Sequence, residues 1–129
     1  MATVNLDTAS RLDIVCRKGD TFTLVLDFGV SMDNTPGNWK MQIAPSDTDA
    51  AVLTFEGSTN FAIATNDDGV ADAKVTITAT STVMGGVASG LYVYDLQTDT
   101  NTAGTTGGTV KTHLYGTFKI NEDITFGTV

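Results

Sequence analysis

The segment SGLYVYDLQ at residues 89–97 places two tyrosines two positions apart, after a glycine and before an aspartate. Such a pair could exchange protons or bind a ligand, but acid–base catalysis also needs a partner base within hydrogen-bond reach. The chain has one histidine, His113, and one cysteine, Cys16. Neither stands in the spacing of nucleophile, base and orienting carboxylate that marks a catalytic triad. We therefore expect no enzymatic activity and no cofactor.

Three further patterns have simpler explanations than the chemistry they suggest. NDDGVAD at residues 66–72 lacks the alternating oxygen ligands and the distant glutamate of a calcium loop, and it predicts a tight turn. GTTGGTVK at residues 104–111 lacks the GK[ST] ending of a phosphate-binding loop, and it predicts a polar loop. Residues 18–20, Lys-Gly-Asp, also predict a turn. We expect no metal site.

The bulk properties exclude several classes of partner. A chain of 129 residues fits one domain, and its single cysteine allows no intrachain disulfide. A net charge of −8 opposes binding to nucleic-acid phosphates. No apolar run approaches the length of a membrane span, and the first residues do not resemble a signal peptide. We expect no nucleic-acid or membrane partner, and synthesis in a cytoplasm.

Strand signals cover most of the chain, and they define the expected core. The alternation in residues 21–28, 39–43 and 110–120 separates inward from outward side chains. In the last segment, Val110 and Thr112 are expected inward, whereas His113 and Tyr115 are expected outward. Asp95 is expected inward if Tyr94 faces out. The predicted core residues are Phe22, Leu24, Leu26, Trp39, Tyr92, Leu114 and Phe118.

These segments predict an all-β fold, an antiparallel β-sandwich of about seven to eight strands without a disulfide. An immunoglobulin-like sandwich has a buried aromatic in its third strand, where Trp39 falls. SGLY at residues 89–92 matches a tyrosine corner, in which Tyr92 bonds backbone near the preceding corner. We assign residues 1–11 to an N-terminal arm, 12–125 to the sandwich and 126–129 to a tail.

The order of three motifs resembles small structural modules of tailed bacteriophages. The motifs are CRKGDTFTLVLDF at residues 16–28, SGLYVYDLQ at 89–97 and VKTHLYGTFKINEDIT at 110–125. The resemblance covers roughly residues 12–125. The modules often begin longer baseplate or fibre proteins. The resemblance implies an immunoglobulin-like module of a virion structural protein.

We therefore expect a non-enzymatic virion protein that is assembled in the host cytoplasm and docked in many copies on the outside of the particle. A capsid decoration or cement protein is the first reading, and a tail or baseplate adaptor is the second. Its partners would be the major capsid protein or tail and baseplate proteins, with homo-oligomer or lattice contacts between copies. A third reading is a carbohydrate- or host-surface-binding module that stacks Tyr115, His113 or Trp39 on sugars. The candidate interface residues are His113, Tyr115, Asn121, Asp123 and Phe126.

Overall fold

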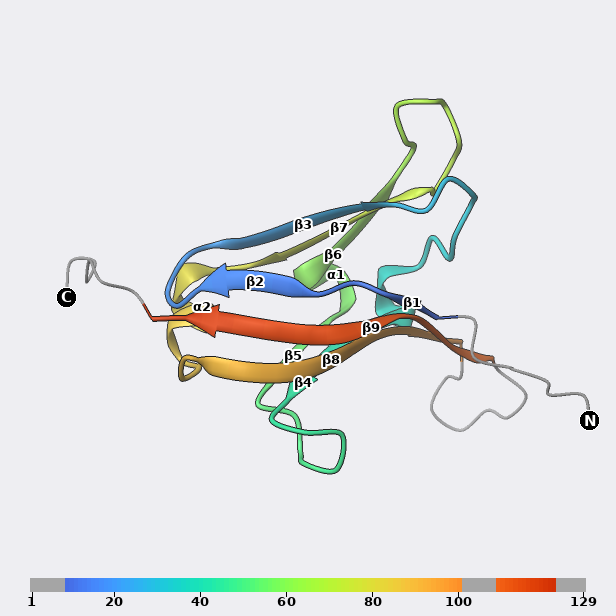
Figure 1. Ribbon diagram of the computed structural model, residues 1–129. Helices are drawn as coiled ribbons and strands as arrows, with labels where there is room; N and C mark the ends of the chain where they lie inside the picture. The colour runs from blue at the N-terminus through green and yellow to red at the C-terminus, as the bar shows by residue number, and fades with distance from the viewer. Residues whose placement is uncertain (1–8, 101–108, 123–129) are drawn as a thin grey trace, which may run out of the picture.

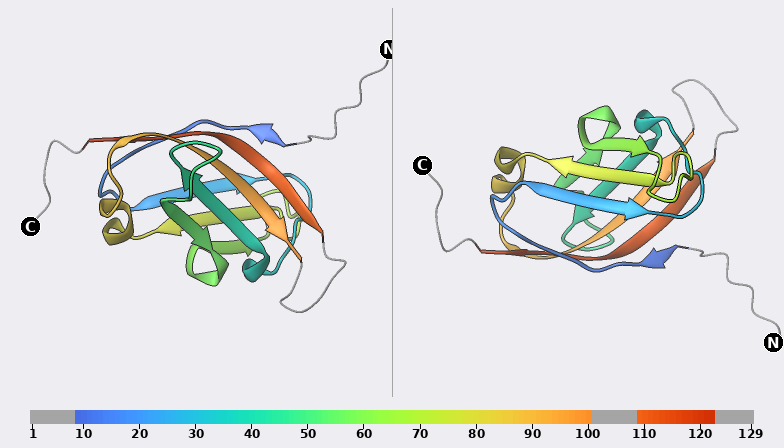
Figure 2. Two further views of the ribbon diagram at one scale, coloured as in Figure 1. Left: turned by 90° about the horizontal axis from the view of Figure 1, so that it is seen from below. Right: turned by 90° about the horizontal axis from the view of Figure 1, so that it is seen from above.

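Two β-sheets pack face to face in the computed structural model, which describes residues 9–100 and 109–122 (Figure 1). The larger sheet contains β1 (Ser10–Arg11), β2 (Ile14–Arg17), β4 (Trp39–Ala44), β5 (Leu53–Glu56), β8 (Gly90–Asp99) and β9 (Val110–Asn121). The smaller sheet contains β3 (Phe22–Asp27), β6 (Phe61–Ala64) and β7 (Lys74–Ala79). Figure 2 shows the larger sheet from below and the smaller sheet from above.

Three short helical segments connect the strands of the described residues: η1 (Pro36–Asn38), α1 (Gly57–Asn60) and α2 (Ser81–Gly85). None of the helices in this part of the chain is long and apolar enough to cross a membrane. The expected all-β, two-sheet architecture is therefore confirmed, and the one cysteine, Cys16, is free.

The strand order differs from a wholly antiparallel sandwich at one edge. The larger sheet runs β1-β9-β8-β4-β5, with β2 also on β9, and the smaller sheet runs β3-β7-β6. Both β1 and β2 pair parallel with β9, whereas the other pairs are antiparallel. The two edge strands are separated only at Leu12 and Asp13, which is one reason that the described residues form nine strands. Moreover, β1 lies inside the segment that we assigned to an arm.

The core fills the space between the two sheets, because alternate side chains of each strand point inward. Trp39 and Phe118 have no exposed surface. The Phe22 ring lies between Phe55 and Phe118, with ring centroids 5.4 and 5.5 Å away. Among the other predicted core residues, Tyr92 and Leu114 are buried, whereas Leu24 and Leu26 are half-buried and pack against the core.

The start of β8 is fixed by the first tyrosine of SGLYVYDLQ. The Tyr92 hydroxyl donates a hydrogen bond of 2.6 Å to the carbonyl of Ala88, in the connection that follows α2. The hydrogen bond lets a polar tip enter the core without an unsatisfied donor. Tyr94, two residues on, also faces inward, and Asp95 consequently faces outward.

A β-bulge in β9 overturns part of the expected alternation. Leu96 of β8 lies opposite Leu114 of β9, but the next residue, Gln97, lies opposite Thr112. His113 is thus an extra residue, and every side chain before it changes face. Val110, which we expected to face inward, is 53% exposed. His113, which we expected to face outward, instead turns toward the core.

The turn predicted at residues 66–69 is confirmed, and a buried asparagine holds it together. Oδ1 of Asn66 accepts the amide N–H groups of Asp68 and Val70 at 3.1 and 2.8 Å. The Asn66 amide donates to the Asp27 carboxylate at 3.1 Å, which ties the turn to the end of β3. This hydrogen bond is the main reason that the pKa of Asp27 is lowered.

Candidate functional site

The outer face of the larger sheet carries a straight row of polar side chains. Gln42 lies opposite Asp95, Asp95 opposite Tyr115, and Tyr115 opposite Arg11, so the row crosses β4, β8, β9 and β1. Directly opposed residues in a sheet share a face. Because Tyr94 faces the core, this row faces solvent, and Tyr115 is 39% exposed.

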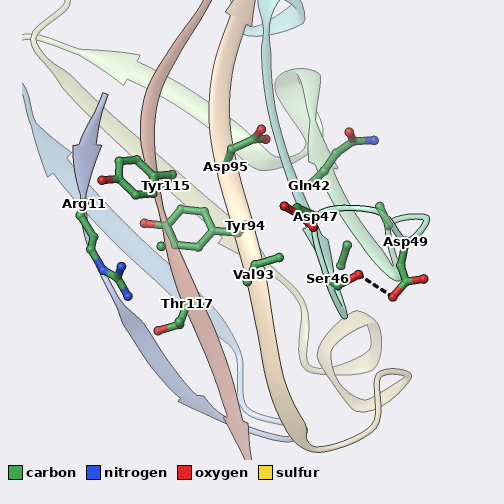
Figure 3. Close-up of a pocket in the computed structure, with 13 residues that line it drawn as sticks. Arg11, Gln42, Ser46, Asp47, Asp49, Val93, Tyr94, Asp95, Tyr115 and Thr117 are labelled. Atoms are coloured by element: carbon green, nitrogen blue, oxygen red, sulfur yellow. Dashed lines mark hydrogen bonds between the residues drawn. The ribbon is translucent and has the colours of Figure 1, made fainter. Parts of the chain in front are cut away.

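A concavity of about 430 Å³ lies beside this row, under the loop that joins β4 to β5. Figure 3 shows Arg11 and Tyr115 on one side and Asp47 on the other, with Val93 between them. Ser46 donates a hydrogen bond of 2.8 Å to the Asp49 carboxylate, which orders the loop at its rim. The concavity thus combines an apolar floor with polar walls.

The charges around this concavity are unevenly paired. The Arg11 Nε lies 3.2 Å from the Asp13 carboxylate, and both side chains are about half exposed. The carboxylates of Asp47 and Asp95 make no hydrogen bond or ion pair with any described residue. Burial raises the pKa of Asp95, because removal of water disfavours the charged form. Unpartnered carboxylates are therefore available to accept hydrogen bonds from a ligand.

The edge of the face is held in place by a close backbone approach at Gly116. A Cβ at Gly116 would overlap the Leu12 carbonyl, so the missing side chain provides the space for the edge strand. The Tyr94 hydroxyl donates to that same carbonyl. The Asp13 carboxylate accepts the amide N–H of Thr117 at 3.0 Å, the leading cause of its lowered pKa. Together these contacts connect the residues between β1 and β2 to β8 and β9.

Tyr94 has a structural role in this cluster. Burial, assisted by the negative charge of Asp13, raises the pKa of Tyr94 to about 12. The phenol is consequently protonated at neutral pH and serves as the donor to Leu12. The two tyrosines of SGLYVYDLQ therefore anchor backbone at two places, Tyr92 at the Ala88 carbonyl and Tyr94 at the Leu12 carbonyl.

His113 lies on the opposite side of β9 from Tyr115. Its ring centroid is 5.3 Å from that of Trp39 and 6.0 Å from that of Phe28, and its Nε2 forms a hydrogen bond of 2.9 Å with Thr98 Oγ1. Burial is the main cause of its lowered pKa, so the ring is neutral at pH 7. Trp39 has no exposed surface, so the expectation that it could stack on a sugar is wrong.

The other predicted positions lie at the end of β9 or outside the described residues. Asn121 is half-buried at the end of β9, where its carbonyl accepts the amide N–H of Lys18 at 2.8 Å. Asp123, Phe126 and most of the polar loop lie outside the described ranges. Within those ranges, no three His, Cys, Asp or Glu side chains are grouped to hold a metal ion.

The remaining cysteine and the nearby turn have local explanations. Cys16 is half-buried, and burial raises the pKa of its thiol, which disfavours the reactive thiolate. The predicted turn at residues 18–20 is closed by the hydrogen bond from the Asp20 N–H to the Arg17 carbonyl at 3.2 Å.

Sequence reasoning identified Tyr115 but missed the partners that surround it. Arg11 had been assigned to an arm, and no pattern in the sequence singled out Asp47. The pairing of β1 with β9 places Arg11 beside Tyr115, whereas Asp47 comes from the loop between β4 and β5, and no local spacing signals either. No family model matches the chain, and no curated protein matches it.

Proposed function

We propose that the protein is a non-enzymatic structural protein of a tailed-phage virion. It docks in many copies on the outside of the particle, with capsid decoration as the first role and a tail or baseplate adaptor as the second. The motif resemblance supports this proposal, and its segments lie in β2, β9 and β8 of the larger sheet and in β3 of the smaller sheet. CRKGDTFTLVLDF covers the end of β2 and all of β3, SGLYVYDLQ begins just before β8, and GTFKI lies in β9. These motifs specify a scaffold.

We further infer that the scaffold is an immunoglobulin-like sandwich. Three features support the inference: the buried Trp39 on β4, the Tyr92 hydrogen bond to Ala88, and the strand order of both sheets. The order β3-β7-β6 corresponds to strands B, E and D of that fold, and β9-β8-β4-β5 corresponds to G, F, C and C′. Cys16 has no partner cysteine, so the inter-sheet disulfide of antibody domains has no counterpart.

One surface feature carries the docking role. Leu91 and Val15 are 65% and 64% exposed, and both lie opposite Lys119 of β9 on the outer face of the larger sheet. Single exposed apolar residues are ordinary on a protein surface. Here two large ones flank the same lysine across three adjacent strands, and Tyr115 lies further along β9 on the same face. Contact with a neighbouring virion protein would bury this surface, and repetition over a lattice would add avidity.

Mass spectrometry of purified particles tests the proposal. We expect peptides of this chain in gradient-purified virions of the phage that encodes it, at a constant ratio to the major capsid protein across the gradient. Abundant host cytoplasmic proteins serve as the contamination control. If the chain is absent from particles, or falls with the host proteins during purification, the proposal fails. Cryo-electron microscopy of the same particles then separates capsid from tail placement.

A pair of variants tests the docking face. Leu91→Asp places a carboxylate opposite Lys119 on the outer face of the larger sheet. We expect it to reduce incorporation into particles at least about tenfold, because the contact would lose a large apolar side chain and would have to desolvate two charges. Val25→Asp is the matched control, because Val25 is 55% exposed on β3 of the smaller sheet. Equal incorporation of both variants would exclude the outer face as the docking surface.

A further inference from the structure

The concavity beside the Gln42–Asp95–Tyr115–Arg11 row has the size of a small-molecule site. Its volume of about 430 Å³ falls within the range of roughly 300–1,000 Å³ that is usual for ligand pockets. It is built by residues of four strands and one loop, and hydrogen bonds hold both rims: Ser46 with Asp49 on the loop, and Thr117 with Asp13 at the edge strand.

The lining of this concavity combines three kinds of group. Tyr115 supplies a partly exposed aromatic ring, and Val93 supplies an apolar floor. Asp47 and Asp95 supply carboxylates that have no partner among the described residues. Arg11 supplies N–H donors from the opposite side, as Figure 3 shows. A ligand that uses all three must offer an apolar face, hydroxyl donors and oxygen acceptors.

We propose that this concavity binds a pyranose sugar. The C–H face of the sugar ring would pack on Tyr115, as apolar groups do on aromatic side chains. Adjacent sugar hydroxyls would donate to the Asp47 and Asp95 carboxylates, and a sugar oxygen would accept from Arg11. Both side chains are exposed in the free protein, so the sugar hydroxyls would replace water as the hydrogen-bond donors to their carboxylates.

Other ligand classes fit the same residues less well. An anion would face the carboxylates of Asp47, Asp49 and Asp95 as well as the net charge of −8. A metal ion would need a set of grouped ligands, and the described residues contain no group of three or more. A neutral polyhydroxyl compound is attracted by donors and acceptors alike, and it also uses the aromatic ring.

A single site of this kind binds weakly. At about 0.3 kcal/mol per non-hydrogen atom, a monosaccharide reaches a Kd in the millimolar range. Many copies on one surface would raise the effective affinity for a glycan-coated surface by a factor of about 100 or more. The sugar site goes beyond the docking role proposed above, and it is tested on the isolated chain, so either proposal can fail without the other.

Titration by nuclear magnetic resonance tests the site on the ¹⁵N-labelled full chain. The probes are D-glucose, D-galactose, D-mannose, L-rhamnose and N-acetyl-D-glucosamine, each raised to about 50 mM. We expect at least one sugar to give saturable shifts of the amide signals of Val93, Asp95 and Tyr115. The signals of Thr76 and Thr78 on the smaller sheet are expected to stay in place.

Variants decide whether the response belongs to this concavity. Tyr115→Ala and Asp95→Asn are each expected to weaken the Kd at least about fivefold, because stacking or a hydrogen-bond acceptor is lost. The matched control, Val25→Ala on the smaller sheet, is expected to leave the Kd unchanged. The amide spectrum of each variant shows whether it is folded, and Asp95→Asn keeps the test valid if Tyr115→Ala is not.

Three results would overturn the proposal. The first is the absence of saturable shifts with every sugar of the panel. The second is an unchanged Kd in folded Tyr115→Ala and Asp95→Asn. The third is broadening of the Val93 and Tyr115 signals that depends on protein concentration without any response to sugar, which would identify the face as a contact between copies of the chain.

Discussion

Replacement of Gly116 by alanine tests how the edge strand is attached to the sheet. The added methyl group would overlap the Leu12 carbonyl and lie 2.9 Å from the Asp13 carboxylate. The first obstacle is backbone in the segment that joins two paired strands, so a change of side-chain rotamer cannot relieve it. The Leu12 segment must move away from β9, and the hydrogen bond from the Tyr94 hydroxyl to the Leu12 carbonyl must lengthen or break.

Two contributions set the size of the effect. Insertion of a methyl group into a closely packed place costs about 1–3 kcal/mol. Loss of the Tyr94 hydrogen bond adds about 1 kcal/mol. We therefore expect Gly116→Ala to lower the free energy of unfolding by roughly 2–4 kcal/mol. A domain stable by about 5–15 kcal/mol would remain folded at room temperature, so the loss is measurable.

Urea unfolding followed by tryptophan fluorescence measures the change, because Trp39 is buried. Gly37→Ala is the matched control, since nothing lies within 4 Å of a Cβ there. It is expected to stay within about 0.5 kcal/mol of the wild type. In the Gly116→Ala background, Tyr94→Phe is expected to cost less than it does alone, because the two changes remove the same hydrogen bond. A Gly116→Ala midpoint equal to that of the wild type would refute this account of the edge.

Three further changes test the core. Tyr92→Phe is expected to cost about 1 kcal/mol of stability in urea unfolding, because the Ala88 carbonyl loses its donor, and an unchanged midpoint would contradict that role. Trp39→Ala is expected to cost about 3–5 kcal/mol by the loss of its buried ring, as measured by circular dichroism, and a near-neutral result would count against its place in the core. The pKa of His113 lies below its ordinary value of 6.5, so the unfolded chain takes up that proton first as the pH falls. Its contribution to stability is therefore complete above pH 6.5 and is lost as the pH falls toward the folded-state pKa. Urea midpoints between about pH 5 and 7 are expected to show this loss in the wild type and not in His113→Gln, and equal slopes would refute it.

The sequence predicts the two-sheet architecture well where alternation is uninterrupted. Trp39, Met41 and Ile43 face inward as expected, because β4 is central in its sheet and has one regular period of two. Val110 and His113 were placed on the wrong faces, because a single extra residue in β9 exchanges the faces on its N-terminal side. No residue type near His113 signals this bulge.

The polar row on the outer face was less predictable than the fold. The row pairs Arg11 with Tyr115, which lies more than a hundred residues later in the chain. Parallel pairing between strands so far apart leaves no periodic pattern in a sequence. A glycine within a strand, as at Gly116, favours a bulge or a close backbone approach, and the structure has the close approach. Only the structure shows that the approaching backbone is Leu12.

The parallel attachment of β1 and β2 to β9 determines how the protein responds to a pulling force. Parallel strands place the start of β1 and the end of β9 at opposite ends of the pair, as the register from Ser10–Leu114 to Arg17–Asn121 requires (Figure 1). Tension applied through the two ends of the described chain therefore acts along the strands. It shears the hydrogen bonds of both edge strands together, whereas a hairpin pulled at its open end separates one bond at a time. The larger sheet is therefore arranged to resist tension along its strands.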